Sequence, residues 1–146
     1  MSLEYMKAVD ATEDSMYASN TTGSVISVVL GGTNVPLPNN QNLSSFSVNG
    51  ANDTFTIPMN GLYFISYQVN ITAALAVNSR LILNGSTPLP GSIIDPVLNA
   101  SSFQNSMIAT LNQGDTITLE LFGLLGLATL LGGGATGAAL NIIRLA

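Results

Sequence analysis

The clearest alternation of hydrophobic and polar positions lies in residues 55–72 and predicts two strands joined by a tight turn. One side of the second strand is apolar or aromatic, with Tyr63, Ile65, Tyr67, Val69 and Ile71. The other side carries Ser66, Gln68, Asn70 and Thr72, with Leu62 and Phe64 as apolar exceptions at one end. Alternation with a period of two is typical of a β-strand that has one face in a core.

Shorter segments of the same kind recur along the chain and are separated by turn signals. The sequence predicts strands at 25–30, 46–48, 54–57, 62–73, 79–83, 103–111, 116–122 and 137–145, and a loop at 34–42. Asn-Gly pairs at 49–50 and 84–85, and Gly114-Asp115, mark turns. Short strands at a spacing of roughly 8–15 residues describe an all-β fold, either a β-sandwich or a jelly roll.

The predicted core is formed by the inward side chains of three of these strands. Its candidates are Phe55, Ile57, Tyr63, Ile65, Tyr67, Val69, Ile117 and Leu119.

The apolar segment at residues 121–140 allows two interpretations. It has 20 residues and no charge, which is the length of a membrane-spanning helix. Its six glycines, three of them consecutive at 132–134, are unfavourable for a helix. We therefore expect two apolar strands joined by a Gly-rich loop and no membrane span; a spanning or buried helix is the alternative.

The composition changes the picture because charged residues are scarce. They make up 8% of the 146 residues, against roughly 25% in a typical soluble domain. A surface made of Asn, Ser, Thr and Gly suits an extracellular coat, or a subunit that buries its surface against copies of itself. Five of the eleven charged residues lie in the first 14. We expect residues 1–20 to be a polar lead-in, tag or linker and residues 21–146 to be the domain.

The side chains needed for most chemistry are missing. The chain has no Cys and no His, so no thiolate, no imidazole base and no usual zinc ligand is present. Asp115 and Glu120 are five residues apart, which places them on opposite faces of a strand. Asp53 and Asp95 lie in turn contexts, and no Asp-rich calcium loop occurs. We predict no catalytic residue, no metal site and no cofactor.

The cations are too few to bind nucleic acid, which requires clusters of Lys and Arg. The net charge is −5, with three basic residues. Arg80 and Arg144 each lie on a predicted strand in an apolar setting. They are expected either to face solvent or to pair with a carboxylate across a subunit boundary.

The order of motifs resembles a known family. F-x-I-P-x-x-G-x-Y-x-I-x-Y-x-V at residues 55–69 is followed by L-I-L-N-G at 81–85 and L-x-x-G-D-x-I-x-L at 111–119, then by a short apolar C-terminal strand. This order resembles the trimeric jelly-roll superfamily of the complement 1q globular head and tumour necrosis factor. More narrowly, the chain resembles the C-terminal domain of the collagen-like glycoproteins of the Bacillus spore exosporium.

The resemblance implies a homotrimer and explains the mixed face of the long strand. In such a trimer Phe64, Ser66, Gln68 and Asn70 would face the threefold axis. The implied function is a trimerising head domain of a collagen-like filament on a spore or cell surface, outside the cell, with other surface-layer proteins as further partners. The alternatives are a ligand- or receptor-binding trimer of complement-head or cytokine type and, less in keeping with the composition, a jelly-roll enzyme.

Overall fold

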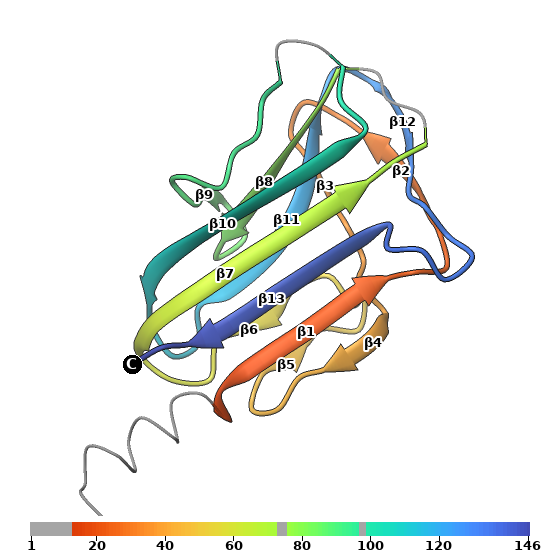
Figure 1. Ribbon diagram of the computed structural model, residues 1–146. Coiled ribbons are helices and arrows are strands. Elements are labelled where there is room, and N and C mark those ends of the chain that lie inside the picture. The colour runs from red at the N-terminus through yellow and green to blue at the C-terminus, as the bar shows by residue number, and fades with distance from the viewer. Residues whose placement is uncertain (1–12, 73–75, 97–98) are drawn as a thin grey trace, which may run out of the picture.

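The chain folds as two antiparallel sheets packed face to face, together with a two-stranded extension (Figure 1). The computed structural model describes residues 13–72, 76–96 and 99–146, and every named element in them is a strand. The strands are β1 (Ser15–Asn20), β2 (Val25–Val28), β3 (Thr33–Asn34), β4 (Asn39–Asn42), β5 (Ser47–Val48), β6 (Phe55–Thr56), β7 (Gly61–Asn70), β8 (Val77–Leu83), β9 (Thr87–Pro88), β10 (Ser102–Leu111), β11 (Thr116–Gly123), β12 (Gly126–Thr129) and β13 (Ala138–Arg144).

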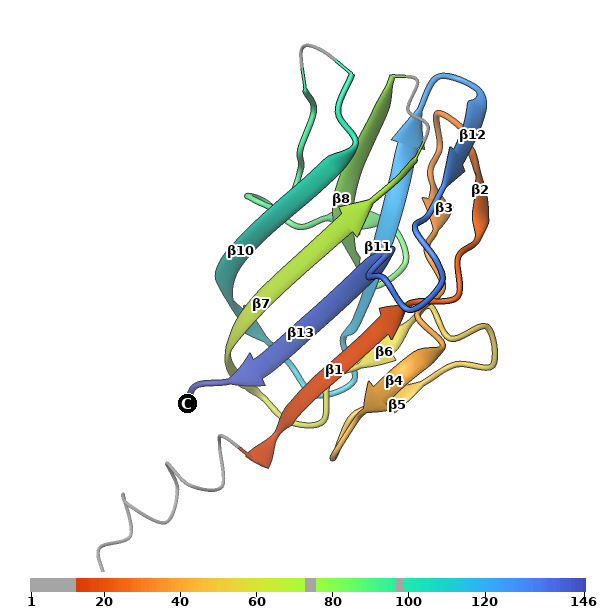
Figure 2. The same cartoon turned by 45° about the vertical axis from the view of Figure 1, so that its right-hand side comes forward.

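The first sheet has the order β10-β7-β13-β1-β4, and the second has the order β5-β6-β11-β8-β9 with β3 on β11. Neighbours that are far apart in sequence, such as β1 and β13, therefore lie side by side. Figure 2 shows the first sheet in front of β8 and β11. Strands that alternate between sheets in this way form a jelly roll, which confirms the predicted fold class.

The core lies between the two sheets and takes one face of each. All eight core candidates are at most 3% exposed. In β7 the alternation appears as buried Tyr63, Ile65, Tyr67 and Val69, separated by half-exposed residues. Leu81, Leu119 and Leu121 fill the facing side from β8 and β11, and Phe46 packs edge-on against the Tyr63 ring at 6.2 Å.

The apolar segment at residues 121–140 is used in strands, as expected. It forms the end of β11, then β12, and then the beginning of β13, with the glycines at 132–134 in the loop between the last two. Gly133 and Gly134 have positive φ values, which a helix would not allow. None of the described residues belongs to a helix with the length and hydropathy needed to cross a membrane.

The expected boundary at residue 20 is corrected by β1. Ser15–Asn20 is a strand paired along its whole length with β13, so the domain begins at least six residues before the expected start at 21. Met16 and Ala18 point into the core and are 3% and 0% exposed. The sequence signal was weak because only these two positions are apolar on the inward side of the strand. Its partner strand also lies far along the chain, since Ser15 pairs with Ile143 and Asn20 with Ala138.

The predicted loop at 34–42 is also corrected, since it contains β4 at its end. This strand consists of NNQN and lies at the edge of the first sheet, where polar side chains are common. The Asn39 side-chain oxygen accepts a hydrogen bond from the Thr21 amide at 2.9 Å, which ties the edge to the end of β1. An Asn-rich strand of this kind depends on side-chain bonds rather than on a hydrophobic period.

Truncation tests the position of this boundary. A chain starting at Glu13 should fold, whereas one starting at Thr21 should not, because it loses Met16 and Ala18 from the core and exposes the edge of β13. The measurement is urea unfolding followed by near-ultraviolet circular dichroism. The signal comes from the tyrosines, because the chain has no tryptophan. A cooperative transition of equal midpoint in both chains would contradict the assignment of β1 to the fold.

Candidate functional site

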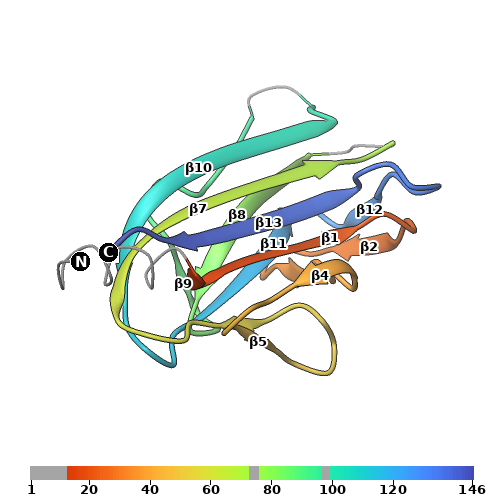
Figure 3. The ribbon, with the colours of Figure 1, turned by 60° about the horizontal axis from the view of Figure 1, so that its bottom comes forward.

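The face of the first sheet that points away from the core is the candidate site, and Figure 3 shows this sheet from another side. We call it the outer face. It is formed by the outward side chains of four strands and comprises Ser15, Tyr17, Ser19, Leu62, Phe64, Ser66, Gln68, Asn70, Gln104, Ser106, Ile108, Thr110, Ala139, Asn141 and Ile143. The four interface candidates from the sequence all belong to it.

Apolar side chains are grouped at one end of the outer face. Phe64 pairs directly with Ile108 on β10 and with Ile143 on β13. We call these three residues the apolar row. Ile108 is 60% exposed, and Leu62 on the next outward position of β7 is 38% exposed. Cross-strand neighbours lie about 4.5–5.5 Å apart, so the three side chains form one continuous apolar strip.

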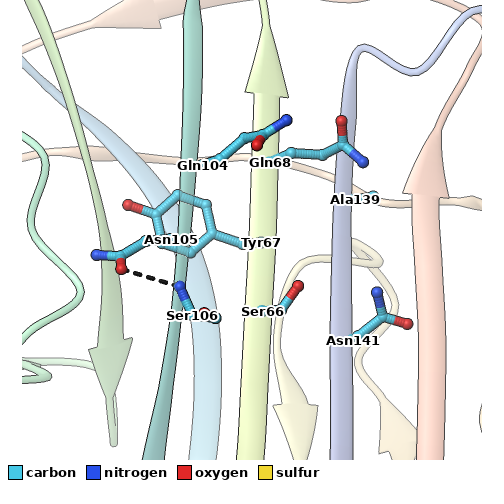
Figure 4. Close-up of a pocket in the computed structure, with 8 residues that line it drawn as sticks. All are labelled: Ser66, Tyr67, Gln68, Gln104, Asn105, Ser106, Ala139 and Asn141. Atoms are coloured by element: carbon cyan, nitrogen blue, oxygen red, sulfur yellow. Dashed lines mark hydrogen bonds between the residues drawn. The ribbon is translucent and has the colours of Figure 1, made fainter.

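Polar side chains occupy the adjoining part of the outer face in two further rows. Ser66 pairs with Ser106 and Asn141, and Gln68 pairs with Gln104 and Ala139. The rows enclose a shallow hollow of about 480 Å³, lined by Ser66, Tyr67, Gln68, Gln104, Asn105, Ser106, Ala139 and Asn141 (Figure 4). The hollow carries amides and hydroxyls and no charged group.

Asn70 extends the polar part toward the far end of β7 and is held in place. Its side-chain nitrogen donates to the Thr136 carbonyl at 3.0 Å, and its side-chain oxygen accepts from the Ser102 hydroxyl at 2.9 Å. The Asn70 nitrogen also donates to the Gln68 side-chain oxygen at 3.3 Å, so both amides among the four interface candidates have a partner within their own subunit.

Both arginines are paired within the subunit, which corrects the two expectations for them. Arg80 lies 2.6 Å from Glu120 and stacks over Phe122 at 3.9 Å. Arg144 lies 3.1 Å from Asp14. The four charged side chains are 10–18% exposed, so they neither face solvent freely nor await a carboxylate from another subunit. The outer face is left without a charge.

Gly61, the first residue of β7, is needed for space and not for a positive φ. Its φ is not positive, so its backbone is open to other residues. A side-chain carbon at this position would lie 2.5 Å from the Ala146 carbonyl oxygen and 2.6 Å from Arg144 Nε. The glycine therefore permits the close approach of the C-terminus, whose Ala146 oxygen accepts from the Leu62 amide at 3.0 Å.

The isolated carboxylates serve turns. Asp115 accepts from the Asn112 amide at 2.8 Å, and Asp53 accepts from the Asn49 side chain at 2.8 Å. Within residues 13–72, 76–96 and 99–146, no three Asp, Glu, His or Cys residues come together as metal ligands would. What the outer face offers is a neutral surface, apolar at one end and amide-rich beside it, which is suited to contact and not to bond-making chemistry.

Sequence reasoning found the β7 residues of the outer face and missed those that the fold brings beside them. Ile108, Ile143, Asn141 and Tyr17 come from three other strands. Ile108 has a local signal, because it is a large apolar residue between outward Ser106 and Thr110. Tyr17 and Asn141 have none, since only the pairing of β1 with β13 places them on this face.

Comparison with solved structures defines the class. The crystal structure of murine APRIL at pH 8.0 matches with a TM-score of 0.64, 18% identity, and coverage of 90% of this chain and 98% of that one. Eiger TNF from S. frugiperda matches with a TM-score of 0.60 and 13% identity, covering 90% and 91%. Rabbit GITRL matches with a TM-score of 0.52 and 17% identity, covering 84% and 93%. The chain is a jelly-roll domain of the tumour-necrosis-factor-like type.

The family is narrower than the fold. Residues 16–146 match the model of the BclA C-terminal domain, and the chain belongs to that family. This confirms the resemblance inferred from the order of the motifs. Family and fold place the chain among structural and binding modules and not among enzymes. No curated protein sequence matches the chain.

Tyr67 provides a test of the packing beneath the outer face. Its hydroxyl donates to the Ser92 carbonyl at 2.5 Å and lies 2.9 Å from the Ser79 hydroxyl. Burial raises the pKa of Tyr67 above 10. A raised folded-state pKa means that stability is complete below about pH 10 and falls as the pH rises above it, because the unfolded chain releases the proton more easily.

Tyr67→Phe should therefore have two effects. It should lower the free energy of unfolding at pH 8 by about 1–3 kcal/mol, because the Ser92 carbonyl loses its buried partner. It should also reduce the fall in stability between pH 9 and pH 11. Urea unfolding at pH 8, 9 and 11 measures the two effects. If the variant keeps the pH dependence of the wild type, Tyr67 is not a buried, neutral group.

Proposed function

We propose that this chain is the trimerising head domain of a collagen-like filament protein of the spore surface, and that the outer face is where the three copies meet. The membership of the BclA C-terminal domain family supports the first part. The apolar row on an uncharged sheet face, with Ile108 60% exposed and Phe64 and Ile143 partly exposed, is the observation that carries the second.

The energetics favour burial of the outer face. An aliphatic or aromatic side chain contributes about 1.5–3 kcal/mol when it is fully removed from water. In a threefold assembly each apolar side chain is buried three times, so Phe64, Ile108 and Ile143 would supply nine buried groups. The neighbouring Ser and Gln rows can exchange hydrogen bonds between copies without the desolvation cost that a buried charge carries.

The position of the chain ends agrees with a stalked head. The beginning of β1 and the C-terminus lie at one end of the sandwich, and the β11–β12 turn lies at the other (Figures 1 and 2). A collagen-like stalk entering before β1 would leave the opposite end of the head pointing outward from the spore. We propose an extracellular location because of the family, with other surface-layer proteins as further contacts of the outward end.

A binding module of cytokine or complement-head type is the alternative within the same fold. The hollow of about 480 Å³ lies on the outer face, beside the apolar row. A ligand site there would compete with assembly for the same surface. Assembly predicts that the outer face is buried between copies, whereas a ligand site there requires it to be open. The association state of the chain distinguishes the two functions.

The test is a charge placed in the apolar row. Phe64→Asp should convert a trimer into a folded monomer, because it would bring three carboxylates together in an apolar contact. Sedimentation equilibrium at micromolar concentration measures the mass, and circular dichroism reports the fold. Ile65→Asp, one position along, should instead prevent folding, since Ile65 is 0% exposed between the sheets.

Ser86→Asp is the matched control for the added charge. Ser86 is exposed in the turn between β8 and β9, on the other sheet, and the variant should keep the wild-type mass. A monomeric wild-type chain would overturn the proposed assembly. A fully stable trimer of Phe64→Asp would show that the copies meet through another surface.

A further inference from the structure

The end of the sandwich opposite the beginning of β1 and the C-terminus carries a second exposed apolar surface. It consists of Val25, Leu30, Leu124, Leu125 and Leu127, which are 60–79% exposed. We call these five residues the apolar tip. They account for half of the ten exposed large hydrophobic residues in the described part of the chain. Such a concentration at one end of a domain marks a contact surface.

The fold holds the five residues together. Leu124 and Leu125 form the turn between β11 and β12, and Leu127 follows on β12. The pairing of Leu127 with Ser27 and of Thr129 with Val25 places Val25 and Leu127 on the outward face of the two-stranded sheet. Leu30 and Leu124 line the same small hollow of about 220 Å³. The tip is therefore one surface and not five scattered side chains.

The turn is narrow and firmly anchored. Gly123 and Gly126 flank the two leucines, so the turn has no other side chain at its end. The Gly123 amide donates to the Val29 carbonyl at 3.1 Å, and this bond joins the turn to the segment that carries Leu30. Two leucines on an anchored turn can enter a soft apolar phase without any rearrangement of the sandwich.

The charges around the tip argue against an anionic surface. Residues 15–52, which contain β2, and residues 121–143, which contain β12, have no charged side chain. The small hollow beside Leu30 and Leu124 is lined by Asp95, which is acidic. A surface rich in anionic lipid attracts Lys and Arg. Arg80 reaches this end of the molecule, since its Nη2 lies 3.5 Å from the Gly31 carbonyl oxygen, but it is already paired with Glu120 at 2.6 Å. The described residues therefore offer no unpaired cation here.

The area of the tip argues against a stable protein partner. A specific protein interface buries roughly 800 Å² on each side, with about 20–30 residues. The five side chains of the apolar tip supply much less. A lipid surface needs no complementary shape and gains from each apolar side chain that enters it.

We propose that the apolar tip binds an uncharged lipid surface, with Leu124 and Leu125 entering the boundary between headgroups and acyl chains. Ser27 and Thr129 beside it would remain among the headgroups. A single tip binds the lipid surface weakly. Three tips on one assembly bind with a higher overall affinity, because the second and third tips are held near the surface by the first. Only this gain in affinity rests on the proposed trimer; the binding of a single tip does not.

The experiment is flotation of the chain with vesicles of pure phosphatidylcholine. The chain should float with the vesicles, and raising the salt from low to high concentration should leave the bound fraction unchanged. The double variant Leu124→Ser/Leu125→Ser should bind at least about tenfold more weakly, since two buried aliphatic side chains are lost. Adding phosphatidylserine to the vesicles should not strengthen binding.

The matched control is Met59→Ser/Ile93→Ser, which removes two other apolar side chains of 50% and 47% exposure away from the tip. It should float as the wild type does. Failure of the wild type to float, equal flotation of the tip variant, or binding that requires phosphatidylserine would each overturn the proposal.

Mass measurements without lipid separate this proposal from the trimer. If the tip variant has a lower mass than the wild type, the tip is a contact between copies and the lipid assignment is wrong. If the wild type is a monomer and still floats through Leu124 and Leu125, the proposed assembly fails and the lipid site stands. Phe64→Asp should float more weakly than the wild type, and its remaining flotation should still depend on the two leucines.

Discussion

The rest of the structure depends on the pairing of β7 with β10 on one side and β13 on the other. These contacts place a ten-residue strand in the interior of a sheet, where its backbone is hydrogen-bonded to a neighbour on each side. One of its two faces lies in the core, and the other points away from the core. Tyr63, Ile65, Tyr67 and Val69 fill the space between the sheets. Once that face is buried, the outward position of Phe64 follows from the pleat, and a one-residue change of register would exchange the two faces.

Because charged residues are scarce, the outward face of β7 and its neighbours is not covered by charged side chains. A domain with a usual share of Lys and Glu could cover the outward side of such a sheet with charged side chains. Here the charges on the strands, Arg80, Glu120 and Arg144, are already paired. Arg80 binds Glu120 on the neighbouring strand, and Arg144 binds Asp14 immediately before β1. The outer face is left with aliphatic, aromatic and amide groups. Exposing the apolar side chains of such a surface to water is unfavourable in free energy. The proposed contact with copies of itself would remove them from water.

The parts of the fold that the sequence predicted are those with strong local signals. The β7 alternation, the Asn84-Gly85 turn with both residues at positive φ, and the Gly-rich break at 132–134 were sufficient for the core and the sandwich. The strand β1 was missed because Met16 and Ala18 are its whole inward apolar pattern and its partner lies at the other end of the chain. Ten of the fifteen residues of the outer face, those on β1, β10 and β13, were missed because only strand pairing brings them beside β7. The presence of Ile143 beside Phe64 is a consequence of topology, and no local period contains it.

The two uncovered apolar surfaces differ in shape, and the difference decides what each can contact. The outer face is a broad, twisted sheet with a regular pattern of rows, so a second copy can match it position by position, and burial there is rewarded by directional bonds between amides as well as by exclusion of water. The apolar tip is a narrow turn with Leu124 and Leu125 at its end and no polar pattern to match. A partner protein would need a pocket for it, whereas a fluid apolar phase would not. The first surface runs along the length of the sandwich, and the second lies at the end away from the C-terminus. If copies meet through the sheet as we propose, their turns remain uncovered, so one head could use both surfaces at once.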